Sequence, residues 1–447
     1  MTGVYTIPSG YSFLESFAIG LLRRSNDDPF RFSQIEIFLP TRRACIELKR
    51  AFMRQGEGRC LLLPKLSPIG DLDEDEELLS SPQDEFGLKP LISPLQRLGL
   101  LTKLIEDYTV KTGMPSSPAL SLKLAKSLVR LMDQAIIENV PWEGLYNLVP
   151  DEFANHWQLT LDFLEIITTY WPKVLEEKGL MEPYARHHKL VDAMVSRWEK
   201  KPPSHPILAA GSTGTMLATA RLLQAIAALP QGEVILPGLD TSLSESEVKA
   251  FSPCHPQYAP TRFLEKMNLL PSEVPPWSGL EGQKEECGAR AHLFAQALKS
   301  MFVPPRSPDQ ESLSPCFRRD KTFLSKDDKS NTNKLSSLGE LSETRGSYSF
   351  NREEALKGVY LVPCASPQEE AIAIAILLRQ QLEIPHQRTA LITSDLRLAE
   401  RVTWELKRWG IEIDSSAGDP LHQTPAGVFL SLCAEFIAFP QDKIALL

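Results

Sequence analysis

The sequence has few cysteines, no long apolar run and no excess of positive charge, and each shortage argues against a class of protein. The seven cysteines are scattered and form no Cys-x-x-Cys pair, so we expect reduced thiols rather than a disulfide framework or a zinc site. No apolar run approaches the roughly 20 residues that span a bilayer, and residues 1–7 lack the features of an export signal. We therefore expect a cytoplasmic protein with no membrane partner.

The charge balance argues against one mode of nucleic-acid binding. The formal net charge of the 447-residue chain is −9, so its surface is not expected to coat nucleic acid as a globally basic protein does. A local basic groove remains compatible with this balance. The chain is 43% hydrophobic and 23% charged, which is typical of a globular protein, and its length suggests two to three domains.

The first part of the chain alternates predicted strands and helices. A strand at Val4–Ile7 precedes a helix at Ser12–Arg24, and a second strand at Ile35–Leu39 precedes a helix that Thr41 caps and that ends at Arg54. The apolar segment Cys60–Pro64 predicts a third strand. Such units build a parallel α/β sheet, and we assign residues 1–93 to its first part.

A helical insertion is expected at 94–204. Apolar residues recur there at helical spacing in three sets: Leu98, Leu101 and Ile105; Leu120, Leu124, Leu128, Leu131, Ala135 and Ile136; and Leu161, Leu164 and Ile167. Strands at Ile207–Ala210 and Glu233–Pro237, around a helix at Met216–Leu229, then predict the second part of the first α/β domain at 205–302.

The rest of the chain predicts a linker and the start of a second domain. Residues 303–350 are serine-rich with mixed charge and few large apolar side chains, which is typical of a flexible insertion or linker. Strands at Gly358–Pro363 and Thr389–Thr393 alternate with helices at Glu369–Leu382 and Leu396–Trp409. We assign 351–447 to an incomplete second α/β domain.

The loop after the first strand occupies the place of a nucleotide-binding loop. A working loop reads Gly-x-x-x-x-Gly-Lys-Ser/Thr, and its lysine reaches the terminal phosphates. Ser9, Gly10 and Ser12 form only a degenerate version, with Leu14 and Glu15 in place of the lysine and the magnesium-binding hydroxyl. A carboxylate at a helix start disfavours a phosphate, so a tight strand–helix turn is the favoured interpretation.

Thr41, Arg42 and Arg43 are the best candidates for DNA contact, with Lys65 as a weaker companion. A hydroxyl and two guanidinium groups at a helix amino terminus favour a phosphate through both charge and dipole. The alternative is that the arginines are solvated or pair with Glu47 and the acidic run 71–77.

The loop at Ser212 and Thr213 is a second candidate, because its amides could contact a DNA phosphate; the alternative is an ordinary capped helix start. The acidic run 71–77 is interpreted as solvated surface rather than a magnesium site. No arrangement of nucleophile and base is visible, so we predict neither a catalytic residue nor a metal site.

Seven segments together resemble the AddB family, the second subunit of the AddAB helicase–nuclease, in the type found in alphaproteobacteria. Their order and spacing cover nearly the whole chain except 303–350. They are Val-Tyr-Thr-Ile-Pro-Ser-Gly (4–10), Phe-Leu-Pro-Thr-Arg-Arg-Ala (38–44), Leu-Leu-Pro-Lys-Leu-Ser-Pro-Ile-Gly-Asp-Leu-Asp-Glu-Asp (62–75), Ala-Ala-Gly-Ser-Thr-Gly-Thr (209–215), Leu-Pro-Gly-Leu-Asp (236–240), His-Pro-Gln-Tyr (255–258) and Arg-Trp-Gly-Ile-Glu-Ile-Asp-Ser-Ser-Ala-Gly (408–418).

The resemblance implies a superfamily-one helicase architecture of two RecA-like domains with helical insertions. It also implies an AddA-type helicase–nuclease subunit as partner, DNA ends as ligand, a role in double-strand break repair and recombination, and a nucleoid-associated location. Family members carry a carboxy-terminal RecB-type nuclease with an iron–sulfur cluster. No residue of this chain can be assigned to either, so we expect no cofactor here and regard the chain as a fragment, a split gene product or a decayed copy.

The sequence thus predicts a helicase-like, motor-dead DNA-binding subunit. Two alternatives stay open. One is an active ATPase, against which the missing lysine argues. The other is a non-functional remnant or a protein-interaction scaffold, which an exposed apolar face on the second domain would favour.

Overall fold

A computed structural model describes residues 3–24, 29–56, 62–70, 88–113, 117–140, 142, 163–280, 288–302, 355–385, 387–416, 418, 421 and 424–438. The chain divides into two compact units, Met1–Lys357 and Gly358–Leu447. The predicted linker 303–350 and the acidic run 71–77 lie outside the described residues. In the part of the chain described, no helix is long and apolar enough to cross a membrane.

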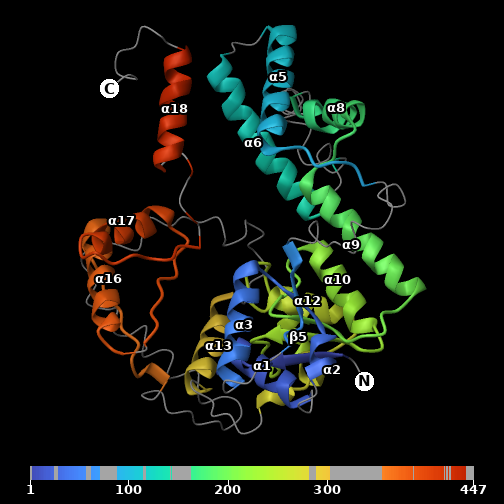
Figure 1. The fold of residues 1–447 in the computed structure, drawn as a ribbon, viewed down its shortest axis with the longest axis vertical. Helices are drawn as coiled ribbons and strands as arrows, with labels where there is room; N and C mark the ends of the chain where they lie inside the picture. Colours follow the sequence, from blue (N-terminus) through green and yellow to red (C-terminus); the bar gives the residue numbers. More distant parts are fainter. Residues whose placement is uncertain are drawn as a thin grey trace, which may run out of the picture. The chain divides into compact units, whose positions relative to one another are not determined.

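Unit 1 is built on a five-stranded parallel sheet, as the alternation of strands and helices predicts (Figure 1). The strands are β1 (Val4–Ile7), β2 (Glu36–Leu39), β3 (Lys65–Pro68), β4 (Ile207–Ala210) and β5 (Gly232–Pro237), in the spatial order β1-β5-β4-β2-β3. Strands from both sides of 94–204 therefore share one sheet, and the α/β fold is confirmed.

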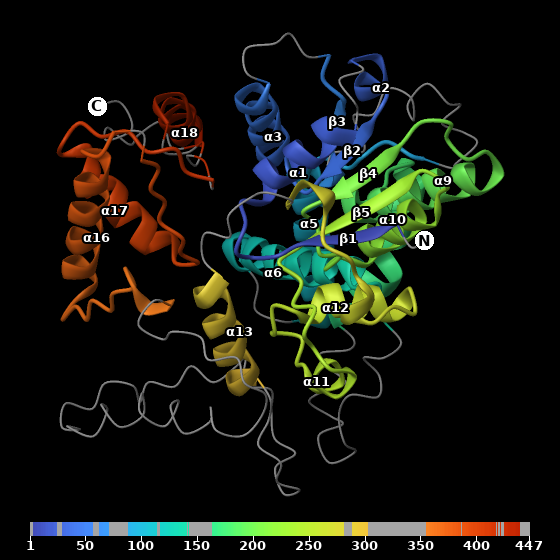
Figure 2. The ribbon, with the colours of Figure 1, turned by 90° about the horizontal axis from the view of Figure 1, so that it is seen from below.

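Helices cover both faces of this sheet (Figure 2). Helices α1 (Phe13–Arg24) and α3 (Arg42–Gln55) pack on one face through apolar side chains such as Phe17, Leu48 and Phe52. Helix α10 (Leu217–Ala228) packs on the other face, together with α12 (Tyr258–Lys266). Every residue of β2 and β4 is buried, which is why β4 and residues 37–39 of β2 are continuously apolar and do not alternate with polar residues.

The third strand is not where the sequence predicts it. The strand is Lys65–Pro68, and residues 62–64, the described part of the predicted strand Cys60–Pro64, are not in a strand. β3 lies at the edge of the sheet with Lys65 opposite Glu36 of β2. An edge strand has a solvated side and tolerates lysine and proline, so its apolar signal is weak. The opposite edge is covered, because Thr6 of β1 donates to the Pro275 carbonyl (3.0 Å) and accepts from the Trp277 amide (2.9 Å).

The insertion between β3 and β4 contains α5 (Pro94–Thr112), α6 (Pro118–Ile137), the π-helical turn Ile166–Tyr170, α8 (Trp171–Lys178) and α9 (Pro183–Lys200). Leu101, Ile105 and Leu164 are buried as predicted. The predicted face of α6 is wrong in part: Leu128 is buried as predicted, but Leu120 and Leu131 are exposed, and Ser121, Ala125 and Met132 are buried in their place. Small side chains at this contact let α5 and α6 approach closely, which a purely apolar pattern does not anticipate.

A buried ionic cluster joins three parts of the insertion. The Arg97 guanidinium on α5 donates to Glu182, which precedes α9 (Nε–Oε1 3.1 Å), and to Asp133 on α6 (Nη1–Oδ1 2.7 Å). The Trp171 indole donates to the same Glu182 carboxylate at 2.6 Å. Burial raises the pKa of Glu182 above its ordinary value, while the Arg97 charge opposes that rise.

The remaining helices of unit 1 are α2 (Pro29–Ser33), α11 (Glu245–Ala250), α13 (Gly288–Phe302) and two short 3-10 turns at Pro271–Glu273 and Ser278–Leu280. Unit 2 contains α16 (Pro367–Leu382), α17 (Leu396–Lys407) and α18 (Pro425–Ala438). Of these, α16 and α17 pack through a small core of Ala371, Ala375, Val402 and Leu406.

Two predictions about unit 2 and the cysteines are wrong. Segments 358–363 and 389–393 are not paired into a sheet, and the described part of unit 2 holds no strand. The side chains of 358–363 are all exposed, whereas those of 389–393 alternate between exposed and partly buried, with Leu391 packed against the core of α16 and α17. A strand without a neighbouring strand leaves its backbone groups to water. Cys254 is disulfide-bonded, whereas Cys45, Cys364 and Cys433 are free thiols; spacing along a chain does not report which sulfurs meet in space.

Candidate functional site at the carboxyl edge of the sheet

The parallel sheet gathers most of the predicted site residues at one edge. Because all strands run in the same direction, the loops that follow β1, β2, β4 and β5 meet where the strands end. Ser9 and Gly10 follow β1, Thr41 follows β2, and Ser212 follows β4. Segments about 170 residues apart in sequence are thereby brought to the same place.

The chain reverses its order of strand addition between β2 and β4, which are neighbours in the sheet. Helix α3 leads from β2 to β3 on one side, while α10 leads from β4 to β5 on the other. The two helices also pack on opposite faces of the sheet. In open α/β sheets, ligands bind at such switch points, outside the carboxyl ends of the strands. Thr41 and Ser212 flank this point. Phe38 of β2 is paired with Ala209 of β4, and Thr41 and Ser212 each follow their paired residue by three positions.

Thr41 caps helix α3, as predicted. Its backbone is extended (φ −144°, ψ 158°), and its hydroxyl accepts the Ala44 amide at 3.1 Å. A capping hydroxyl still has a hydrogen to donate. Arg42 and Arg43 occupy the exposed first turn of α3. Each of the two arginines makes an interaction inside the protein.

The loop after β4 does not cap the next helix in the expected way. Helix α10 takes Met216 as its N-cap and receives no side-chain cap. The Thr213 hydroxyl instead bonds to that of Thr215 (2.9 Å), and the Ser212 hydroxyl accepts the Gly214 amide at 3.4 Å. The Met216 side chain therefore offers no acceptor to the first amides of α10, and helix-start amides of this kind can bind an anion.

Gly211, directly after β4, lies close to the segments that follow β1 and β2. It has a left-handed backbone (φ +79°) and continues the sheet by donating to the Ile235 carbonyl at 3.0 Å. A Cβ at this position would lie 3.2 Å from the Phe13 ring and 3.7 Å from Cδ of Pro40. The loop after β4 therefore leaves little room for a side chain at Gly211, between the start of α1 and Pro40 after β2.

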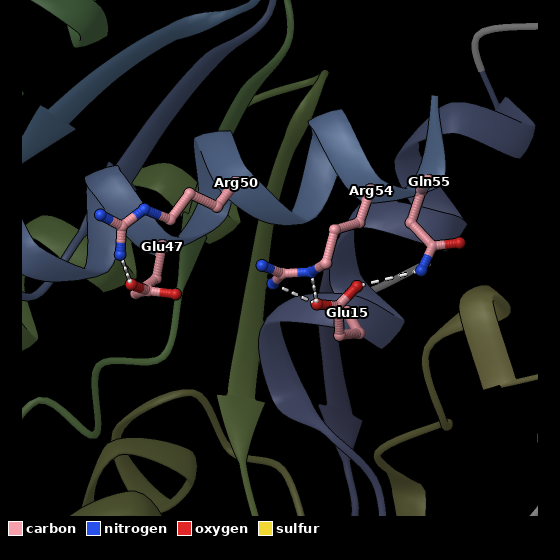
Figure 3. Close-up of polar contacts among 5 residues, drawn as sticks. All are labelled: Glu15, Glu47, Arg50, Arg54 and Gln55. Atoms are coloured by element: carbon pink, nitrogen blue, oxygen red, sulfur yellow. Dashed lines mark hydrogen bonds and ion pairs between the residues drawn. The ribbon is translucent and has the colours of Figure 1, made fainter. Parts of the chain in front are cut away.

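The loop after β1 forms a tight turn in which the Tyr11 amide donates to the Pro8 carbonyl at 3.2 Å. Glu15, in the first turn of α1, is tied to the end of α3, where it accepts Nε of Arg54 at 2.7 Å and Nε2 of Gln55 at 3.0 Å (Figure 3). A separate pair on α3, Glu47 with Arg50, lies farther toward the helix start. Glu15 thus links two helices at a position where a working loop would present a magnesium-binding hydroxyl.

Lys65 does not join the other candidates. It opens β3 and therefore lies at the amino edge of the sheet, where its Nζ is 3.0 Å from Glu36 at the start of β2. The sequence prediction placed Lys65 just after a strand, and the shift of that strand moves the lysine to the opposite edge.

A polar cluster after β5 escaped the sequence prediction, although its residues lie in two of the quoted segments. The Gln257 side chain donates to the Gly238 carbonyl (2.9 Å) and accepts the Asp240 amide (3.3 Å). His255 stacks on Phe251 at 3.8 Å, and burial lowers the pKa of its imidazole, against the opposing effect of Asp240. These contacts order the β5 end of the same carboxyl edge. Only the local sequence His-Pro-Gln-Tyr signalled them.

The described residues contain no group of three or more His, Cys, Asp or Glu side chains that could hold a metal. Comparison with known proteins finds no matching family model and no matching curated sequence.

Proposed function

We propose that this chain is a helicase-like, motor-dead DNA-binding subunit of an AddAB-type helicase–nuclease that acts in double-strand break repair and recombination. Its partner in this proposal is an AddA-type subunit, and its ligand is the single strand at a DNA end. A RecA-like superfamily-one architecture and a nucleoid-associated location are parts of the same proposal, which rests on the resemblance of the seven segments.

One observation carries the proposal beyond that resemblance. Thr41, Arg42 and Arg43 stand at the start of α3, beside the switch point and opposite Ser212 and Thr213. Two helix starts and two cations at one edge suit a phosphate backbone. The neighbouring loop lacks the lysine of a nucleotide site, and its Glu15 is held by Arg54, so we expect no ATP hydrolysis.

The test is binding of labelled single-stranded DNA by fluorescence anisotropy over a salt series, with and without an AddA-type subunit. Each lost phosphate contact lowers the salt slope of a single strand by roughly 0.7, so Arg42→Ala with Arg43→Ala should weaken binding and flatten the slope by about 1.4. Lys200→Ala with Lys201→Ala is the matched control, because it removes the same charge from exposed residues that precede a strand instead of following one.

Equal losses in both double variants would show a general charge effect and reject the site at α3. No binding by the wild-type chain at low salt, with or without the AddA-type subunit, would reject the DNA-holding function itself.

A protein-interaction scaffold is the second candidate, and one observation favours it. Tyr360, Leu361 and Ile392 in unit 2 are 85%, 93% and 95% exposed, which is unusual for side chains of this kind unless a partner covers them. Hydrogen exchange of 358–363 should slow when the AddA-type subunit is added. Unchanged exchange would count against this surface as the contact.

A further inference from the structure

Helix α17 carries a basic face with one tryptophan in its middle. Arg397, Arg401, Trp404 and Arg408 follow one another at helical spacing and are all exposed, Trp404 to 69%. The other side of α17 is fixed, because Val402 and Leu406 pack on α16. The helix is therefore held in place by its packing on α16, and its basic face is exposed to solvent.

Cations lie over Trp404 of this helix and over Trp409, two residues beyond its end. Nζ of Lys407 lies 5.5 Å from the Trp404 ring, and the Arg379 guanidinium of α16 lies 5.0 Å from the ring of Trp409. Trp409 is 39% exposed. Each ring is thus an exposed aromatic surface next to a positive charge. Proteins that bind single-stranded nucleic acids use this combination, because bases stack on the ring and phosphates contact the cation.

The local charge is opposite to that of the whole chain. Arg397, Arg401, Lys407 and Arg408 contribute four positive charges, and Glu400 and Glu405 contribute two negative ones, which leaves +2 on a chain of −9. Glu405 is itself engaged, because it accepts Nε2 of Gln368 at 2.8 Å and Nη1 of Arg408 at 2.7 Å. A basic patch within an acidic chain indicates a local polyanion contact.

We propose that this face of α17 binds single-stranded nucleic acid, with a base stacked on Trp404 and phosphates held by Arg397 and Arg401. The proposal deepens the proposed DNA-binding function and assigns a contact to unit 2, separate from the α3 site in unit 1. A protein partner is the weaker match, since the exposed Trp404 ring is set among Arg397, Arg401, Lys407 and Arg408, and charged residues are depleted at the core of a protein interface.

The experiment is anisotropy with labelled oligothymidylate and the full chain. Trp404→Ala should weaken binding by about 5- to 150-fold, the range for loss of one stacked base, without changing the salt slope. Trp404→Phe should restore part of the affinity. Arg397→Ala with Arg401→Ala should instead flatten the slope by roughly 0.7 per contact. Phe429→Ala is the control, because this ring is also exposed (65%) but lies on α18, whose residues Pro425–Ala438 include no arginine or lysine.

The outcomes separate the two sites. Normal binding by Trp404→Ala, with loss in the Arg42/Arg43 variant, overturns the α17 proposal and leaves the proposed function standing. Loss in Trp404→Ala alone supports α17 and rejects the α3 site. Equal loss in Trp404→Ala and Phe429→Ala, or a Trp404 effect confined to binding of the AddA-type subunit, also overturns the proposal. A wild-type chain that binds no oligonucleotide rejects both.

Discussion

Two segments of similar sequence, one in each unit, have opposite environments: the first is paired and buried, and the second is unpaired and exposed. Unit 1 begins with Val-Tyr-Thr-Ile at 4–7, and unit 2 begins with Val-Tyr-Leu-Val at 359–362. The first is β1, with Val4 and Ile7 at 0% and 1% exposure, paired with β5 on one side and covered by 274–277 on the other. The second is unpaired, with Leu361 at 93% exposure. The local β propensity of the two segments is similar, so the presence of a neighbouring strand decides whether each segment pairs into a sheet.

The helices of unit 2 are nevertheless well formed, because their signals are local. Ser366 caps α16 by accepting the Glu369 amide, and the Asp395 carboxylate caps α17 by accepting the Arg397 amide at 2.9 Å. A helix satisfies its backbone within itself, whereas a strand depends on a segment elsewhere in the chain. The contrast between the units is therefore one between local and non-local structure, and it predicts where substitutions will matter.

The largest contrast should come from Arg97→Met in unit 1 against Arg379→Met in unit 2. Arg97→Met leaves Glu182 buried without its cation, which typically costs about 3–5 kcal/mol. Arg379 is exposed and lies over Trp409, so its loss should cost less than about 1 kcal/mol. Urea unfolding of both variants measures the difference. Similar losses would remove the distinction between the buried and exposed contacts.

The Arg97 loss should also depend on pH. The pKa of Glu182 is raised by burial, so the stability linked to its protonation is present below the ordinary glutamate pKa and is lost as the pH rises through the folded value. Removing Arg97 raises that pKa further. The stability deficit of Arg97→Met should therefore be smallest in acid and grow as the pH rises; a deficit independent of pH would mean that Glu182 is not the affected group.

Leu222→Ala and Leu361→Ala compare the same truncation in a core and on a surface. Leu222 on α10 is 0% exposed within the apolar cluster beneath the sheet, and its truncation should cost about 2–5 kcal/mol. Leu361 is 93% exposed, and its truncation should change the free energy of unfolding by under about 0.5 kcal/mol. A large loss at Leu361 would show that something covers unit 2.

The sequence predicted the parts of the fold that local patterns decide. β1 and β4 have the predicted bounds, and Thr41 caps α3 as expected, because continuous apolar runs and capping residues act locally. The predicted position of β3 was wrong because this edge strand contains a lysine and two polar or proline positions, which weaken its apolar signal. The unpaired segments of unit 2 were misjudged because propensity does not report whether a partner strand exists.

The candidate site was predictable only as separate loops. The pattern identified residues 9–12, 41–43 and 212–213, but the sheet order that places the latter two groups on either side of one switch point required the structure. Because the bounds of β3 were predicted wrongly, Lys65 was predicted at the carboxyl edge of the sheet, whereas it lies at the amino edge. The basic face of α17 was visible in the spacing of Arg397, Arg401 and Arg408. Its solvent exposure was not, since the same spacing fits a helix buried on that side.

The smallest expected contrast tests whether the three loops touch at Gly211. Gly211 and Gly113 both have left-handed backbones (φ +79° and +68°), so alanine should strain each by about 1 kcal/mol. A Cβ at Gly113 meets nothing within 4 Å, whereas one at Gly211 approaches the Phe13 ring at 3.2 Å. Gly211→Ala should therefore cost more than Gly113→Ala in urea unfolding, and Phe13→Leu should recover part of the difference by removing the ring. Equal losses at the two glycines would mean that backbone strain alone sets the cost, and that the loops after β1 and β4 have room between them.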